Sequence, residues 1–126
     1  MSTVLVVDDH PDILELLQVI LTIEGYNVVT ARDGAEAVAA VEQHHPKAVV
    51  MDIWMPRLDG ISATKLIRAL PQQEATPVIA YTADPGSLGI HAPLFSRVCV
   101  KPCAPSVLLH HLADAIRLAS CPAGNA

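Results

Sequence analysis

Four short apolar runs, at 4–7, 48–51, 78–81 and 98–100, constrain the fold more than any other feature, and segments with helical periodicity lie between them. A continuous run of Val, Ile, Leu and Met is typical of a strand that is buried on both faces. Strands that alternate with helices form a parallel sheet with helices packed against both of its faces. We therefore expect strands in five segments: 4–7, 27–31, 48–51, 78–81 and 98–100.

Start and stop signals place helices between these strands. Pro11 at the start and Gly25 at the end indicate a first helix over about 11–24. Asp33 and Glu36 resemble a capping box, with Asp in place of Ser or Thr, and predict the start of a second helix. Two further helices are expected, over about 60–70 and 105–119.

The segment before the last strand contains four helix breakers, so we expect at most a turn or two of helix over 87–96, with mobile backbone; the breakers are Pro85, Gly86, Gly89 and Pro93. Together the elements predict an α/β, flavodoxin-like (βα)5 three-layer sandwich with parallel strand order 2-1-3-4-5 and an irregular or short fourth helix. We expect one domain over 1–120 and a flexible C-terminal tail over 121–126.

Charge and hydropathy restrict the ligands and the location of the chain. A net charge of −5 at pH 7 argues against direct binding to nucleic acid, because contact with phosphates requires a basic surface. Membrane insertion is not expected, since no apolar run approaches the ~18 residues that span a bilayer. The three cysteines contain no C-x-x-C pair, so we expect Cys99 to be a small buried hydrophobic residue and the protein to be cytoplasmic.

Polar side chains occur where four of the predicted strands end. Asp8 and Asp9 follow the first strand, Asp52 the third, Thr82 the fourth and Lys101 the fifth. Ligands of parallel α/β sheets bind beyond the carboxyl ends of the strands, so these side chains are expected to converge. Carboxylates that lie close together repel each other, and Mg²⁺ or Mn²⁺ relieves that repulsion. Lys101 and Thr82 would then contact a phosphoryl group, which the Asp52 carboxylate can accept as a nucleophile.

Each of these residues also has an ordinary structural explanation. Acid pairs at strand ends are often solvated or cap a helix, and Asp12 and Asp33 are expected to be helix-start acids. The six histidines show no metal-ligand spacing, although His10 lies beside the acids, where it could tune metal binding. The four strand ends taken together favour a functional site over these separate explanations.

With these residues, the chain resembles the receiver domain of response regulators in two-component signalling. The resemblance covers residues 4 to about 119 and rests on four motifs: Val-Val-Asp-Asp at 6–9, Met-Asp-Ile-Trp-Met-Pro-Arg-Leu-Asp-Gly at 51–60, Thr-Ala at 82–83 and Lys-Pro at 101–102. It implies a single-domain protein that takes a phosphoryl group on Asp52 in a Mg²⁺-dependent step. The donor would be the phospho-histidine of a sensor histidine kinase or a histidine phosphotransferase.

The resemblance also assigns the metal ligands. Asp9 would bind the ion directly and Asp8 would help, through water. Asp52 and the backbone carbonyl of Trp54 would complete the set. The chain would then be a signalling switch with limited self-catalysed phosphorylation and dephosphorylation at Asp52, and not an enzyme of metabolism.

Around the phosphoryl group, the resemblance implies that Thr82 is the switch hydroxyl, assisted by the backbone N–H of Ala83. Lys101 would pair with a phosphate oxygen, and its peptide bond to Pro102 is cis in relatives. One position departs from the family pattern: Val98 stands where relatives carry a Tyr or Phe that swings inward with the switch hydroxyl. A branched aliphatic side chain cannot make that movement.

The broken fourth segment is the second departure from the family pattern, because relatives often bind their output partner or dimerise through this face. We expect signalling to involve order–disorder of 84–97 instead. The output protein is not specified, and a homodimer is compatible with the sequence. Two alternatives remain: a receiver-like binding module that works without phosphorylation, and a Mg²⁺-dependent phosphohydrolase with an aspartyl nucleophile.

Overall fold

The structure is a computed structural model that describes residues 2–55 and 58–119. Its strands form one parallel sheet in the order β2-β1-β3-β4-β5, which confirms the predicted topology. The tail expected over 121–126 lies outside the described residues. The strands are β1 (Thr3–Val7), β2 (Asn27–Ala31), β3 (Ala48–Asp52), β4 (Val78–Thr82) and β5 (Arg97–Val100).

The helices follow the strands in alternation, as the sequence predicts. Helices α1, α3 and the last helix, α4, begin and end within one residue of the expected bounds, and α2 begins where the capping signal predicts. The 3₁₀ segment η1 replaces the fourth helix. The bounds are α1 (Pro11–Ile23), α2 (Gly34–His44), α3 (Gly60–Ala69), η1 (Pro85–Leu94) and α4 (Pro105–Ala119).

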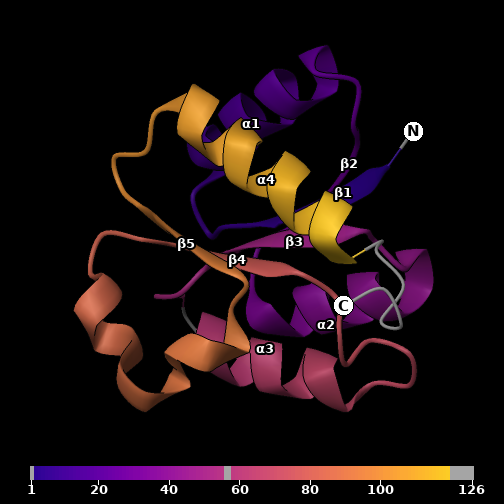
Figure 1. Ribbon diagram of the computed structural model, residues 1–126, viewed down its shortest axis with the longest axis vertical. Helices are drawn as coiled ribbons and strands as arrows, with labels where there is room; N and C mark the ends of the chain where they lie inside the picture. Colours follow the sequence, from indigo (N-terminus) through magenta and orange to yellow (C-terminus); the bar gives the residue numbers. More distant parts are fainter. Residues whose placement is uncertain (1, 56–57, 120–126) are drawn as a thin grey trace.

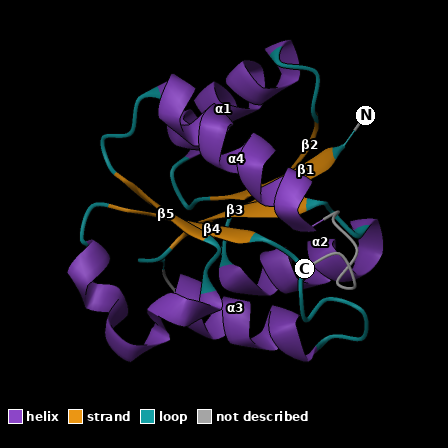
Figure 2. Ribbon diagram, in the orientation of Figure 1, coloured by secondary structure: helices purple, strands orange, loops and turns teal. Residues whose placement is uncertain are grey.

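The helices form two layers, one on each face of the sheet. Figure 1 shows α1 and α4 on one face, and α2, α3 and η1 on the other. Figure 2 shows the sheet between these two layers. Alternate residues of β1 serve the two layers: Leu5 and Val7 pack with α2 and α3, while Val4 and Val6 pack with α1 and α4. Burial on both faces explains why β1, β3 and β4 are apolar without alternation, whereas the edge strands β2 and β5 are partly exposed.

Aspartates cap the helices α2 and α3. Asp33 accepts a hydrogen bond from the backbone N–H of Glu36 at 2.8 Å, and Asp59 accepts one from that of Ser62 at 2.8 Å. A cap of this kind contributes about 1 kcal/mol. The reciprocal half of the predicted capping box is displaced by one residue, because the Glu36 carboxylate accepts from the N–H of Arg32. Asp33 therefore serves as the helix-start acid that the sequence predicts.

The fourth segment is irregular and made of short helical turns, as its breakers predict. Its two 3₁₀ pieces lie on either side of a kink at Gly89, where the backbone is non-helical with φ of 51°. A 3₁₀ helix uses i→i+3 hydrogen bonds, such as that from the N–H of Ser87 to the carbonyl of Asp84 at 3.1 Å. Leu88 anchors the segment in the core on the α3 face of the sheet.

Cys99, which we expected to be only a small buried hydrophobic residue, takes part in a covalent cross-link. Cys99 and Cys103 form a disulfide, with their Cα atoms 6.2 Å apart. The turn after β5 brings Cys103 back toward the strand, within the range that a disulfide can bridge. Cys99 is buried, as expected. Within the described ranges, the structure has no helix that is both long and apolar enough to span a bilayer.

Candidate functional site

The carboxyl ends of β1, β3, β4 and β5 meet at one edge of the sheet. Asp52 pairs with Tyr81, and Thr82 pairs with Val100, the residue before Lys101. The backbone N–H of Lys101 donates to the carbonyl of Thr82 at 2.8 Å, which fixes the start of the loop after β5. The parallel register thus brings polar residues from distant parts of the sequence to the same edge.

Lys101 joins two buried carboxylates at this edge. Its Nζ lies 3.4 Å from Asp8 Oδ2 and 3.3 Å from Asp52 Oδ1. The two aspartate side chains are only 2% and 6% exposed, so their charges are poorly solvated and depend on this ammonium group. The ammonium also lies 4.9 Å from the centre of the Tyr81 ring, in cation–π geometry.

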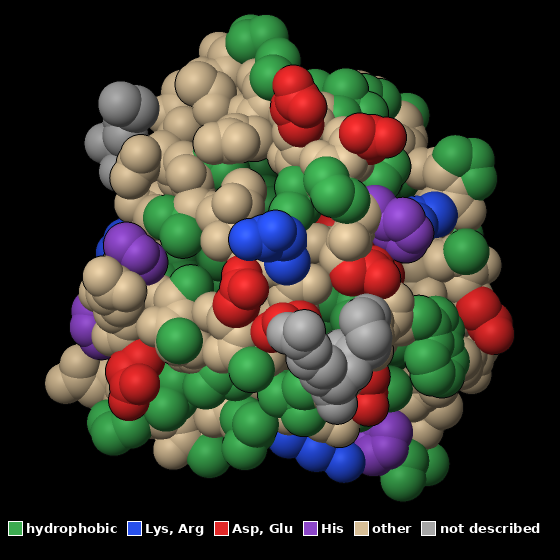
Figure 3. All heavy atoms as spheres, turned by 180° about the vertical axis from the view of Figure 1, so that it is seen from behind, with side chains coloured by type: hydrophobic (Ala, Val, Ile, Leu, Met, Phe, Trp, Pro, Cys, Tyr) green, Lys and Arg blue, Asp and Glu red, His purple; other side chains and the backbone are tan. Residues whose placement is uncertain are grey.

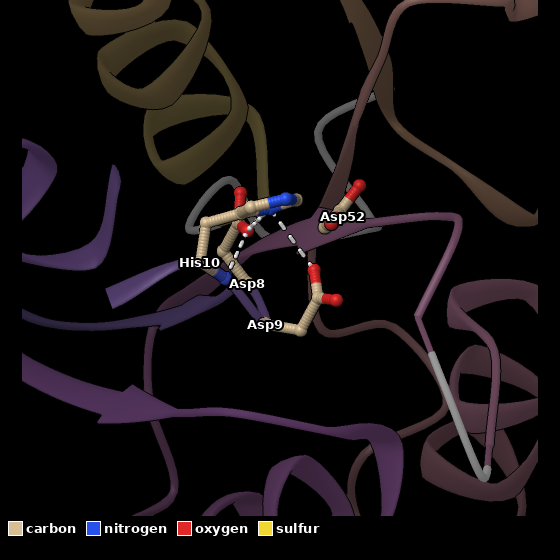
Figure 4. Close-up of side chains that lie close together, drawn as sticks. All are labelled: Asp8, Asp9, His10 and Asp52. Atoms are coloured by element: carbon tan, nitrogen blue, oxygen red, sulfur yellow. Dashed lines mark hydrogen bonds and ion pairs between the residues drawn. The ribbon is translucent and has the colours of Figure 1, made fainter. Parts of the chain in front are cut away.

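On the other side of Asp8 lie Asp9 and His10. His10 Nδ1 is 3.0 Å from Asp8 Oδ1 and 3.1 Å from Asp9 Oδ1. Figure 4 shows the His10 ring and the three carboxylates facing a common space, with Asp52 reaching it from β3 and the other residues from the end of β1. Figure 3 shows acidic, basic and histidine side chains gathered near the middle of one face of the molecule.

The crowding of charge changes the pKa values of these groups. Burial and the neighbouring Asp8 carboxylate raise the pKa of Asp52 to about 6, although Lys101 opposes the change. Burial pulls the pKa of Lys101 down, but the carboxylates of Asp8 and Asp52 outweigh it, so that the pKa of Lys101 is raised. The pKa of His10 is raised by its hydrogen bond to Asp8 and by the charge of Asp9.

The remaining predicted site residues are placed around this cluster. Thr82 is buried, and its hydroxyl accepts a hydrogen bond from the N–H of Asp84 at 3.2 Å. Ala83 is exposed, and the Trp54 side chain is 60% exposed. Val98 packs against the core on the η1 face. The Lys101–Pro102 peptide bond is cis. Pro56 and Arg57 of the motif at 51–60 lie outside the described residues.

The donor atoms at this edge suit a divalent cation. Ligand atoms of Asp8, Asp9, His10 and Asp52 all lie within 4.8 Å of one another. Asp9 Oδ1 is buried and, among the described residues, accepts no hydrogen bond that meets geometric criteria, although His10 Nδ1 lies 3.1 Å away. A buried carboxylate oxygen without a hydrogen bond is costly in free energy, and a bound cation would lower that cost. The residues present therefore fit the metal that an acidic site of this kind implies.

A comparison with family models decides the identity of the fold and the site. The model of the response regulator receiver domain matches residues 4–113. The chain belongs to this family. It is a receiver domain of the kind found in two-component systems.

Individual relatives support this assignment. The receiver domain is 37% identical, over 114 residues and 87% of its length, to the CAI-1 autoinducer sensor kinase/phosphatase CqsS of Vibrio cholerae, of which it covers 17%. It superposes with a TM-score of 0.85 on chemotaxis protein CheY4 of Vibrio cholerae, at 30% identity, covering 91% of this chain and 98% of that one. Of the curated relatives with the strongest matches, it spans between 17% and 61% of the length.

A third relative bears on the metal. The receiver domain of a sensor histidine kinase from Pseudomonas aeruginosa superposes with a TM-score of 0.86, at 31% identity, covering 92% of this chain and 98% of that one. That structure has a magnesium ion coordinated in its active-site cleft. Receiver domains bind Mg²⁺ in their acidic pocket, act as signalling switches and interact with sensor histidine kinases or phosphotransferases.

Two features of the site were not found from the sequence. The ring of Tyr81 beside Lys101 was missed, because Tyr81 looked like an ordinary residue of a buried strand. The close approach of His10 to both Asp8 and Asp9 was expected only as a tuning effect. The available sequence signal for both was adjacency to a predicted site residue, since Tyr81 precedes Thr82 and His10 follows Asp9.

Proposed function

We propose that this receiver domain accepts a phosphoryl group on Asp52 from the phospho-histidine of a partner kinase or phosphotransferase. The observation that carries the proposal is the position of Asp52, buried at the end of β3, in contact with the Lys101 ammonium and close to the carboxylates of Asp8 and Asp9. A carboxylate surrounded by a cation and by further acids is suited to phosphoryl chemistry, and not to ordinary ion pairing at a surface.

In the proposed step, an ionised Asp52 oxygen attacks the phosphorus atom while the bond from phosphorus to the imidazole nitrogen of the partner breaks. The electron pair of that bond stays on the imidazole, which leaves as a neutral base once protonated. With a pKa of about 6, Asp52 is mostly ionised at pH 7 and ready to attack. Lys101, 3.3 Å from the attacking group, would pair with a phosphoryl oxygen.

The other residues have supporting roles in this proposal. Asp9 and Asp52 would hold the ion directly and Asp8 would help through water, with the backbone carbonyl of Trp54 as a further ligand. When bound, Mg²⁺, or Mn²⁺ in its place, supplies positive charge for the phosphoryl oxygens. The Thr82 hydroxyl and the backbone N–H of Ala83 would donate hydrogen bonds to oxygens of the phosphoryl group on Asp52. Phosphorylation would then shift a two-state equilibrium and change the binding of a downstream partner.

We further propose that the domain extends over 1–120 and works in the cytoplasm. The proposal names no output protein and is compatible with a homodimer. The alternative is a receiver-like module that binds its partner without phosphorylation. Val98 favours this alternative, because it cannot make the inward swing of an aromatic side chain. The complete set of Asp9, Asp52, Thr82 and Lys101 favours phosphorylation.

The direct test is incubation of the protein with Mg²⁺ and acetyl phosphate, followed by intact-mass measurement. We expect an added phosphoryl mass that is lost in Asp52→Asn and kept in Asp12→Asn, which removes an exposed carboxylate of the first turn of α1. The adduct should also disappear when EDTA removes the metal. Absence of an adduct from both acetyl phosphate and a phosphorylated histidine donor would favour the module that binds without phosphorylation.

A further inference from the structure

The His10 ring is held in a defined position at the acidic site. The backbone N–H of His10 donates to Asp8 Oδ1 at 2.9 Å, and the ring nitrogen Nδ1 lies 3.0 Å from the same oxygen. Nδ1 is also 3.1 Å from Asp9 Oδ1. Figure 4 shows this nitrogen between the two carboxylates, on the side that faces Asp52. The short link from Asp8 to His10 thus aims a nitrogen atom into a set of oxygen ligands.

These distances match those between neighbouring ligands of one metal ion. In an octahedral site with ligands about 2.1 Å from the ion, adjacent ligand atoms are about 3.0 Å apart and opposite atoms about 4.2 Å apart. Nδ1 lies 3.1 Å from Asp9 Oδ1, which would bind the ion directly, and 3.0 Å from Asp8 Oδ1, which would act through water. The ligand atoms of all four residues lie within 4.8 Å of one another, a limit wider than the spacing of opposite ligands. The buried Asp9 Oδ1, which accepts no hydrogen bond from the described residues, is one of these atoms.

We propose that His10 Nδ1 is a metal ligand, so that the site prefers a first-row transition ion, from Mn²⁺ to Zn²⁺, over Mg²⁺. The proposal rests on the metal site of the proposed function and goes beyond it by naming a ligand and the class of ion. Mg²⁺ favours oxygen ligands, whereas imidazole nitrogen suits the softer transition ions. One neutral nitrogen ligand beside the carboxylate oxygens would therefore shift the preference of the site from Mg²⁺ toward transition ions. The negative charge of the aspartates stays the same.

The same arrangement has one competing explanation. A protonated His10 would donate from Nδ1 to the two carboxylates and would act as a fixed positive charge at the position of the ion. The two explanations predict opposite effects of removing the ring. Loss of a ligand weakens the binding of transition ions and spares Mg²⁺, whereas loss of a fixed cation strengthens the binding of every divalent ion.

The test is a titration of the metal-free, unphosphorylated protein with Co²⁺ and with Mg²⁺, followed by calorimetry and, for Co²⁺, by visible absorption. His10→Ala and His10→Asn are compared with the native protein at one pH, and circular dichroism checks that each variant is folded. We expect the Co²⁺ dissociation constant to rise by about tenfold or more in both variants, with that for Mg²⁺ changed by less than about threefold. The Co²⁺ absorption bands should also shift, because an oxygen replaces a nitrogen ligand.

The matched control is His110→Ala, which removes an exposed imidazole from α4, remote from the acids. It should leave both dissociation constants unchanged. Tighter binding of both ions in the His10 variants would overturn the proposal in favour of a fixed cation, and an unchanged ratio of the two constants would overturn it outright. No phosphodonor is present, so this result is independent of whether Asp52 accepts a phosphoryl group.

Discussion

The Asp52 side chain is buried, but it must be ionised to act as a nucleophile, and burial opposes ionisation. Burial excludes water from the carboxylate and the nearby Asp8 repels its charge, so that its pKa rises to about 6. A nucleophile must nevertheless be ionised, and Lys101 at 3.3 Å supplies much of the compensation. The ionised Asp52 side chain therefore destabilises the folded protein when no metal is bound. A metal ion bound to the acids would lower this cost.

This destabilisation predicts a pH-dependent gain in stability on Asp52→Asn in the absence of metal. The folded pKa of about 6 lies above the ordinary value of 3.8, so the carboxyl favours folding at low pH. That contribution is lost as pH rises from about 4 through 6. Urea unfolding in EDTA should show the variant more stable by up to about 3 kcal/mol at pH 8 and by roughly half as much at pH 5.

The control for this prediction is Glu15→Gln, which neutralises an exposed carboxylate on α1. It should change stability little at either pH. An Asp52→Asn variant that is less stable than the native protein at pH 8 would show that Lys101 more than offsets the burial of the charge.

At the scale of elements, η1 is attached to the rest of the protein by the buried side chain of Leu88 and by hydrogen bonds at its end. The Arg68 guanidinium, on α3, donates to the carbonyl oxygen of Leu94 at 2.8 Å and also to that of Thr76. Arg68 thereby ties α3 to the last residue of η1 and to the loop before β4. The first half of η1, before the non-helical Gly89, depends on the buried side chain of Leu88 and on short 3₁₀ hydrogen bonds.

This attachment predicts where phosphorylation changes the backbone. With Val98 in place of an aromatic side chain, we expect the signal to pass through order–disorder of 84–97. Amide hydrogen exchange should change on phosphorylation in 84–90, where Asp84 contacts Thr82, and much less near Leu94, which Arg68 holds. Equal exchange across 84–97 in both states would contradict this route, and amides of β4 serve as the internal reference.

For the whole molecule, stability comes from two cores separated by the sheet. One core lies between the sheet and α2, α3 and η1, and the other between the sheet and α1 and α4. Strands β1, β3 and β4 contribute side chains to both cores, so neither helical layer can unfold without exposing apolar surface of the shared sheet. Cooperative unfolding in one step is the expected consequence.

Leucine-to-alanine substitutions on opposite faces test this cooperativity. Leu5→Ala in one core and Leu112→Ala in the other, both 0% exposed, should each lower the free energy of unfolding by about 2–5 kcal/mol. Urea unfolding followed by fluorescence and by circular dichroism should give coincident single transitions for both variants. Leu118→Ala, at a residue 48% exposed, should cost less than about 1 kcal/mol. Separate transitions for the two signals would mean that the layers unfold independently.

The sequence by itself determined the fold class, the strand order and most element bounds, because apolar runs and helix signals act locally and repeat regularly. It also indicated the edge of the sheet where the acids, Thr82 and Lys101 meet, since parallel strands end on the same side. It predicted an irregular fourth segment but did not determine its 3₁₀ form, because breakers prohibit an α-helix but do not specify what replaces it.

Only the tertiary structure decided which side chains at the strand ends contact one another. The bridge of Lys101 between Asp8 and Asp52, the ring of Tyr81 beside it and the pairing of Cys99 with Cys103 arise from how the loops after the strands turn. The same is true of His10, which the sequence placed beside the acids without showing which way its ring points. Periodicity specifies the side of a strand or helix that is buried, but the direction of a loop side chain is set by the atoms around it in the folded molecule.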